Sequence, residues 1–120
     1  MDLRHVFGSA GESSAANYLR RKGYKIIERN YSCRFGEIDI IAQKGMYIIF
    51  VEVKTRKNEE FAMAREFVTY GKQQRIIKTA MLWLQQNDSE LQPRFDVVEV
   101  IGEGFGRTIR HIENAFEDFL

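Results

Sequence analysis

The chain of 120 residues contains one cysteine, one proline and no long apolar run. Because Cys33 stands alone, no disulfide can form within the chain, and its thiol suits a reducing compartment. A membrane helix needs about 20 consecutive apolar residues, and the first residues also lack the apolar core of a signal peptide. These absences exclude a disulfide-stapled scaffold. They lead us to expect one cytoplasmic domain, residues 1–120, that makes no contact with membranes.

A strong net charge is also lacking, because 18 Lys and Arg face 17 Asp and Glu. The charges are nevertheless unevenly placed. Residues 1–80 carry +6 (fifteen basic against nine acidic), whereas residues 81–120 carry −5 (three against eight). This asymmetry permits a polyanionic partner on one side of the protein, although charged stretches are usually only solvated surface.

Hydrophobic periodicity predicts the element order α-β-β-β-α-β-β. Helices are expected at 7–22, at 70–87 with Thr69 as N-cap, and as a short terminal helix at 115–120. Strands are expected at 24–31, 94–101 and 107–112, with two more in the stretch 36–56. The stretch 57–71 is left open as a helix or a loop beside the site. The glycines of 102–106 precede no long helix, which argues against a nucleotide-binding loop.

The stretch 36–56 contains two apolar runs joined at Lys44-Gly45, which predicts a hairpin. Asp39, Glu52 and Lys54 interrupt these runs. Because side chains alternate along a strand, Glu52 and Lys54 share a face. A four-residue turn would place Asp39 opposite Glu52, and a two-residue turn would place it two positions away on the same face. A charge in a buried strand must be paired, hydrated or bound to metal.

Carboxylate oxygens suit Mg²⁺ or Mn²⁺ better than they suit zinc, so Asp39 and Glu52 form a candidate site for one of these cations. The opposite face of the hairpin is then expected to carry Ile38, Ile40, Val51 and Val53. The alternative is an ion-pair cluster of Asp39, Glu52 and Lys54 on a half-exposed sheet. The hairpin alone does not separate the two interpretations.

Short motifs along the whole chain match one known pattern. They are Gly11-Glu12, Gly23-Tyr24, Arg29-Asn30, Gly36-Glu37-Ile38-Asp39, Phe50-Val51-Glu52-Val53-Lys54-Thr55-Arg56, Lys72-Gln73 and Arg94-Phe95-Asp96. With these motifs the chain resembles the YraN-type family of predicted endonucleases in the PD-(D/E)xK nuclease superfamily, related to archaeal Holliday junction resolvases. The resemblance implies an α/β protein with a restriction-endonuclease-like core, in which helices flank a central mixed β-sheet of about five strands.

The resemblance also implies a metal site that holds Mg²⁺ or Mn²⁺. Asp39 and Glu52 resemble the metal-binding carboxylates of the superfamily. The carbonyl group of Val53 would be a further oxygen ligand. Glu12 resembles the acid on the first helix that binds metal directly or through water.

Other residues resemble the catalytic and substrate-binding groups of these nucleases. Lys54 resembles the lysine that orients or helps activate water and stabilises the charge of the phosphate. Gln73 resembles a polar helical residue beside the site. Arg56, Lys72 and Arg75 are the basic residues that we expect along a nucleic-acid path.

Together these features predict a Mg²⁺- or Mn²⁺-dependent endonuclease that hydrolyses DNA phosphodiester bonds, with branched or damaged DNA as the candidate substrate. Cleavage of a four-way junction needs two active sites related by symmetry, which makes a homodimer the matching assembly. The alternative function is a nucleic-acid-binding or assembly protein that uses a nuclease-like scaffold without cleaving. A purely structural domain is the third and most remote alternative.

Overall fold

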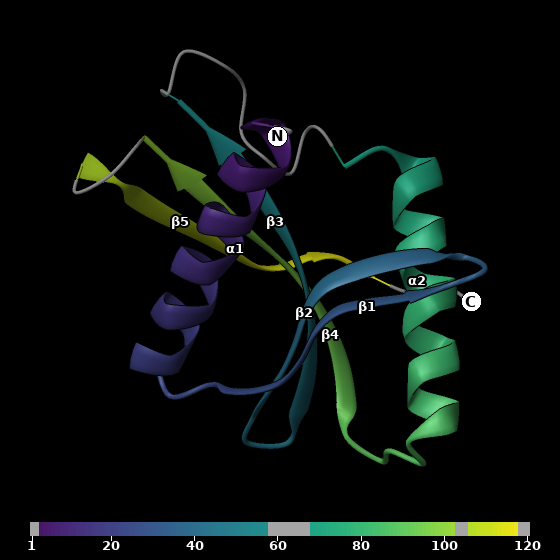
Figure 1. The fold of residues 1–120 in the computed structure, drawn as a ribbon. Coiled ribbons are helices and arrows are strands. Elements are labelled where there is room, and N and C mark those ends of the chain that lie inside the picture. The colour runs from purple at the N-terminus through teal and green to yellow at the C-terminus, as the bar shows by residue number, and fades with distance from the viewer. Residues whose placement is uncertain (1–2, 58–67, 103–105, 118–120) are drawn as a thin grey trace.

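The computed structural model describes residues 3–57, 68–102 and 106–117, with side chains from Ala10 onward. Within these ranges, two helices and five strands follow one another in the expected order (Figure 1). They are α1 (Leu3–Arg21), β1 (Lys25–Cys33), β2 (Gly36–Lys44), β3 (Tyr47–Arg56), α2 (Tyr70–Gln86), β4 (Gln92–Ile101) and β5 (Thr108–Phe116). Neither helix, over its described residues, is long and apolar enough to cross a membrane.

The strands form one mixed sheet in the order β1-β2-β3-β4-β5. Strands β1, β2 and β3 pair antiparallel in sequence, and β5 pairs antiparallel with β4. Strands β3 and β4 run parallel, because the connection that contains α2 returns the chain to the same end of the sheet. The expected α/β class, with a central mixed sheet of five strands flanked by helices, is confirmed.

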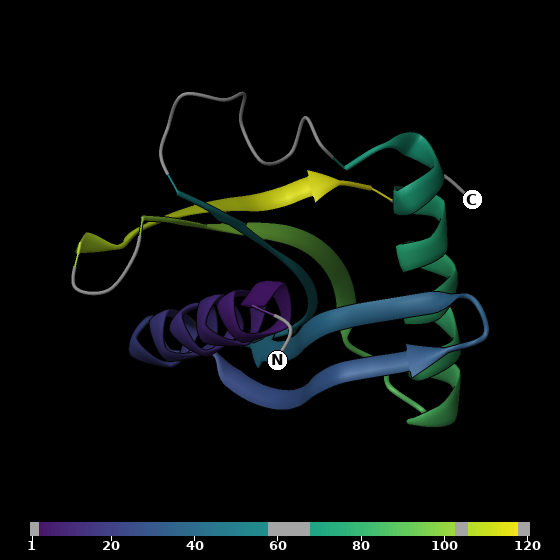
Figure 2. The same cartoon turned by 45° about the horizontal axis from the view of Figure 1, so that its top comes forward.

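The helices cover opposite faces of the sheet (Figures 1 and 2). On one face Leu19 of α1 belongs to the same buried cluster as Val51. On the other face Trp83 of α2 meets Phe50 edge-on, with ring centroids 5.9 Å apart. Successive residues of β3 thus face different helices, as expected for a strand that is buried on both sides. This alternation sends Glu52 to the α2 side.

The turn of the central hairpin lies one residue later than expected. Lys44 pairs with Tyr47, so the turn consists of Gly45 and Met46 rather than Lys44 and Gly45. Gly45 has a φ of +59° and takes the first of the two turn positions. Type II′ hairpin turns need a positive φ at that position, and glycine adopts it without strain.

The terminal helix expected at 115–120 is wrong over its described part. Ala115 and Phe116 are the last residues of β5, and the Phe116 ring stacks on Phe95 at a centroid distance of 5.2 Å. Thr69 caps α2 as expected, since its hydroxyl oxygen accepts a hydrogen bond from the backbone N–H of Lys72 at 3.2 Å. Most of the stretch 57–71 lies outside the described residues, as do residues 103–105 and 118–120.

Candidate functional site

Strands β2 and β3 stop pairing at the point where the candidate carboxylates lie. Their pairing ends at Ile40 and Val51, in the register that brings Asp39 next in line with Glu52. Beyond this point the Asp39 side chain takes the place of a strand partner. Its Oδ2 accepts a hydrogen bond of 2.7 Å from the backbone N–H of Val53. The carboxylate is therefore fixed against β3 beside the peptide groups of the motif that carries Glu52.

The Asp39 carboxyl group lies where a negative charge is unfavourable. Burial, followed by repulsion from Glu52, raises its pKa from 3.8 to about 8. The hydrogen bond from Val53 acts in the opposite direction, and the charges of Glu12 and Glu37 add further repulsion. An ion-paired carboxylate would have a depressed pKa instead. The raised pKa is the signature of carboxyl groups that a shared cation would stabilise.

Glu52 is buried, with 8% of its surface exposed, and it meets two ammonium groups. The Nζ atom of Lys72, from the first turn of α2, lies 2.6 Å from Glu52 Oε1. The Nζ atom of Lys54 lies 3.4 Å from the same oxygen. Part of the ion-pair cluster considered from the sequence is therefore present, but its main cation comes from α2.

Burial disfavours the charged form of both lysines, yet their pKa values move in opposite directions. The pKa of Lys54 is lowered by burial and by the neighbouring Lys72, which together outweigh Glu52. Burial also acts to lower the pKa of Lys72, but hydrogen bonds to Glu52 and Lys54 and the nearby carboxylates outweigh it, so the pKa is raised. Because the pKa of Lys72 is raised and that of Lys54 is lowered, Lys54 loses its proton more readily than Lys72 does.

Helix α1 brings Glu12 to the edge of this site. A Cβ atom at Gly11 would overlap the Cγ2 atom of Thr55, so glycine permits this close approach of α1 to β3. Glu12 Oε2 lies 3.9 Å from Arg29 Nη2. The Asn30 amide, oriented by its hydrogen bonds, donates to both Glu12 oxygens at 3.1 and 3.3 Å. Glu12 therefore has partners in β1 and acts on the hairpin carboxylates through its charge.

Three other expected site residues have local partners or face solvent. The Gln73 amide donates to the carbonyl oxygen of Val68 at 2.9 Å, so it ties the first turns of α2 to the residue before the N-cap. Arg56 Nε lies 3.0 Å from Glu99 Oε1, and only 10% and 1% of these side chains are exposed. This burial favours a structural role for Arg56 over the phosphate contact expected from the sequence. Arg75 is exposed on α2 and is free to meet a polyanion.

The donor set fits a hard cation better than zinc. Asp39 and Glu52 supply two carboxylates, and the backbone between them and Lys54 adds the Val53 carbonyl group. No group of three His, Cys, Asp or Glu side chains that could hold a metal is found in the described parts of the chain. Mg²⁺ keeps several waters and needs only one or two carboxylates, whereas a structural zinc site needs four nitrogen or sulfur ligands.

The expected facing of the apolar hairpin residues holds for three of four. Ile40, Val51 and Val53 pack in the cluster beneath α1. Ile38 packs instead in the cluster beneath α2, and that expectation is wrong. Ile38 pairs with Tyr31 near the end of the β1–β2 hairpin, and this end of the hairpin lies over α2 (Figure 2). Tyr31 packs on the same cluster as Ile38, so both residues are buried on the α2 side.

A second polar cluster lies at the start of β4. Asp96 is completely buried and accepts hydrogen bonds of 2.9 and 2.7 Å from Arg94 and of 3.0 Å from the backbone N–H of Asn114. His111 Nε2 lies 2.7 Å from Asp96 Oδ2. Burial would raise the pKa of Asp96, but hydrogen bonds from His111 and Arg94 lower it. Sequence reasoning assigned no role to this cluster, although the motif Arg94-Phe95-Asp96 was its visible signal.

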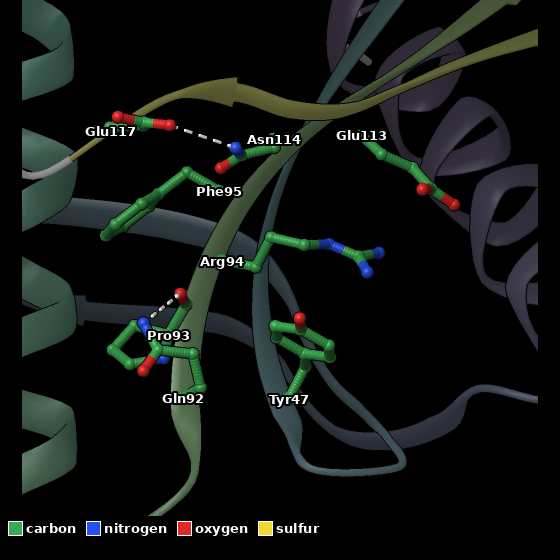
Figure 3. A pocket seen from close by; sticks show the side chains of 8 residues that line it. All are labelled: Tyr47, Gln92, Pro93, Arg94, Phe95, Glu113, Asn114 and Glu117. Atoms are coloured by element: carbon green, nitrogen blue, oxygen red, sulfur yellow. Dashed lines mark hydrogen bonds between the residues drawn. The ribbon is translucent and has the colours of Figure 1, made fainter.

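A hollow of about 820 Å³ opens beside this second cluster (Figure 3). It is lined by Tyr47, Gln92, Pro93, Arg94, Phe95, Glu113, Asn114 and Glu117. The Arg94 guanidinium lies 5.4 Å from the centre of the Tyr47 ring. None of the lining residues is an expected site residue, so the candidate carboxylates lie outside this hollow.

Comparison with known sequences defines the family. The sequence pattern described as "Uncharacterised protein family UPF0102" matches residues 11–100. The chain belongs to this family. A UPF0102 protein of Caldanaerobacter subterraneus is 47% identical over 117 residues, which cover 94% of this chain and 96% of the relative. A UPF0102 protein of Symbiobacterium thermophilum is 50% identical over 111 residues, which cover 91% and 94%.

Membership of UPF0102 confirms the YraN-type resemblance at the level of the family. The matched residues 11–100 include Glu12, Asp39, Glu52, Lys54 and Lys72. The family description names no activity. The chemistry of this UPF0102 protein must therefore be argued from its site.

Proposed function

We propose that this UPF0102 protein is a Mg²⁺- or Mn²⁺-dependent endonuclease of the PD-(D/E)xK type that acts on DNA. One observation carries the proposal. The Asp39 carboxyl group, fixed by the Val53 N–H where β2 and β3 part, has its pKa raised to about 8, with burial and the neighbouring Glu52 as the main causes. A strongly perturbed carboxyl group beside a second carboxylate and a lysine is a pattern of functional sites.

In the proposed site, Asp39, Glu52 and the Val53 carbonyl group would hold the divalent cation, and Glu12 would support it directly or through water. When bound, such a cation would supply a more acidic water and neutralise charge on the phosphate. Lys54 would orient the attacking water and place its ammonium beside the negative charge that develops on the phosphate oxygen. Burial and the neighbouring Lys72 lower the pKa of Lys54, which makes its proton easier to remove than that of an exposed lysine.

The proposed substrate is DNA, with branched or damaged DNA as the candidate class. The excess of basic residues in 1–80 and the exposed Arg75 on α2 support a polyanion on this side of the protein. A homodimer remains our prediction for junction cleavage, and the cytoplasm remains the expected location.

A non-cleaving nucleic-acid-binding or assembly protein is the second candidate. Two observations favour it. Lys72, not a further ligand, contacts Glu52, and the described residues contain no group of three metal-binding side chains. A site that has lost its cation would keep such an ion pair as part of its scaffold.

A cleavage assay separates these candidates. Linear, nicked, flapped and four-way DNA would be incubated with the protein in Mg²⁺, in Mn²⁺ and in EDTA. Lys54→Ala is expected to abolish cleavage while leaving DNA affinity close to that of the parent, because its effect is on the transition state. Lys57→Ala is the matched control, since Lys57 is exposed and its loss changes the net charge equally.

We expect the parent and Lys57→Ala to cut at least one substrate in Mn²⁺ and none in EDTA. Binding of DNA without cleavage of any substrate by the parent would favour the second candidate. Cleavage that persists in EDTA would contradict the divalent-cation proposal.

A further inference from the structure

Lys72 occupies a position that helix stability does not explain. Thr69 is the N-cap, so Lys72 is the third residue of α2. The first turn of this helix contains no acidic residue. The N-terminal end of a helix carries partial positive charge, which disfavours a lysine there, and the third position usually suits Glu or Gln. A residue that breaks this local preference needs a tertiary reason.

The tertiary reason is the Glu52 carboxylate. Lys72 Nζ lies 2.6 Å from Glu52 Oε1, closer than Lys54 Nζ at 3.4 Å. Lys54 is attached to the same strand as Glu52, only two residues along. Lys72 instead reaches the carboxylate from another element on a long side chain, about one third of which is exposed. The Lys72 ammonium can therefore leave Glu52 without moving the sheet.

We infer that Lys72 is a tethered cation that competes with the divalent ion for Glu52. This inference rests on the proposed function. In the protein without bound metal, the Lys72 ammonium neutralises Glu52 and holds its side chain in place. A divalent cation on Glu52 Oε1 would take the place that the Lys72 ammonium now holds at 2.6 Å and would repel it with twice the charge of Lys54, so Lys72 would withdraw when the cation enters. The withdrawn ammonium then lies at the start of α2, on the side of the exposed Arg75, where it can contact a DNA phosphate.

Competition of this kind predicts that removing Lys72 strengthens metal binding. Lys72→Met keeps most of the side-chain length and removes the charge. Lys78→Met is the matched control, because Lys78 is exposed on the same helix and its loss changes the net charge equally. In calorimetric Mn²⁺ titrations we expect Lys72→Met to bind roughly tenfold more tightly than the parent, and Lys78→Met to stay within about twofold. Lys72→Arg retains a positive charge and should bind Mn²⁺ like the parent.

Thermal unfolding gives a second readout, and its response to Mn²⁺ is the part that a merely structural role would not produce. In EDTA, Lys72→Met should unfold at a lower temperature than the parent, since Glu52 loses its nearest cation. Saturating Mn²⁺ should raise the unfolding temperature of Lys72→Met by more than it raises that of the parent. If Lys72→Met does not fold, Lys72→Gln supplies the same comparison with a polar side chain.

Two failures are distinguishable. If the parent binds Mn²⁺ and Lys72→Met binds no more tightly than Lys78→Met, the competition is refuted while the metal site stands. If neither the parent nor any Lys72 variant binds Mn²⁺, the proposed metal site fails and the competition fails with it.

Discussion

The replacement Asp39→Asn gives opposite results for the two interpretations of the hairpin. Asparagine has nearly the same shape, and its side-chain oxygen can still accept the hydrogen bond that the Val53 N–H now donates to Asp39 Oδ2 at 2.7 Å. The change therefore removes the charge and little else. If Asp39 is a carboxyl group held ready for a cation, the variant without metal should be more stable than the parent at neutral pH. If Asp39 is a stabilising ion-pair partner, the variant should be less stable.

The sign and size of the effect follow from the pKa. In the unfolded chain the carboxyl group ionises near 3.8, whereas in the folded protein it keeps its proton until about 8. The folded state binds more protons within this window, so the free energy of unfolding of the parent falls as the pH rises through it. The full effect would be about 4 kcal/mol at pH 7, and the partial exposure of Asp39 reduces it to roughly 1–2 kcal/mol, or about 4–10 °C in Tm.

The assay is urea and thermal unfolding in EDTA between pH 5 and 8.5. The free energy of unfolding of the parent should fall across this range. The stability advantage of Asp39→Asn over the parent should therefore grow as the pH rises. Glu90→Gln, at an exposed position between α2 and β4, is the control for the loss of one negative charge. Parallel pH profiles for the parent and Asp39→Asn, or a variant that is less stable at pH 7.5, would refute the argument.

Three further predictions concern the framework. Gly11→Ala should cost roughly 1–3 kcal/mol because its Cβ would meet Thr55 Cγ2, and adding Thr55→Ser should recover part of the loss; strictly additive losses in urea unfolding would contradict this. Asp96→Asn should cost roughly 3 kcal/mol at pH 7, because the buried carboxylate holds its donors. Since the lowered pKa of Asp96 stabilises the fold above pH 4 and this benefit is lost in acid, the deficit should shrink as the pH falls, and a deficit that grows would oppose the assignment. Glu99→Gln should cost roughly 3 kcal/mol in urea unfolding through its buried contact with Arg56, and a loss below about 0.5 kcal/mol would show that the pair is not structural.

The sequence pattern was sufficient for the order of elements and for a hairpin that brings Asp39 next in line with Glu52. Asp39 and Glu52 interrupt β-branched runs, and the period of two then constrains their face in either register considered. The position of the turn was harder to predict from the sequence, because Gly45 can take the first or the second turn position. The sequence predicts a helix at Phe116, whereas its pairing with Phe95 and the stacking of the two rings place it in the strand.

The contacts between elements could not be read from periodicity. The sequence predicts Lys72 along a nucleic-acid path, whereas its contact with Glu52 depends on how α2 is placed on the sheet. The sequence also could not show whether Arg56 contacts nucleic acid or another side chain, since its partner Glu99 comes from the neighbouring strand β4. Charged residues near a helix start or a strand end can face solvent or each other, and the choice is made by tertiary packing.

The central claim is that Asp39 and Glu52 share one divalent cation, and Mn²⁺ titration by calorimetry at pH 7.5 tests it most directly. The parent, Asp39→Asn, Glu52→Gln and the control Glu90→Gln would be titrated after their folding has been checked by circular dichroism. We predict one site in the parent and in Glu90→Gln, and a loss of at least roughly tenfold in affinity in each site variant. Absence of Mn²⁺ binding by the parent, or undiminished binding by both site variants, would contradict the claim.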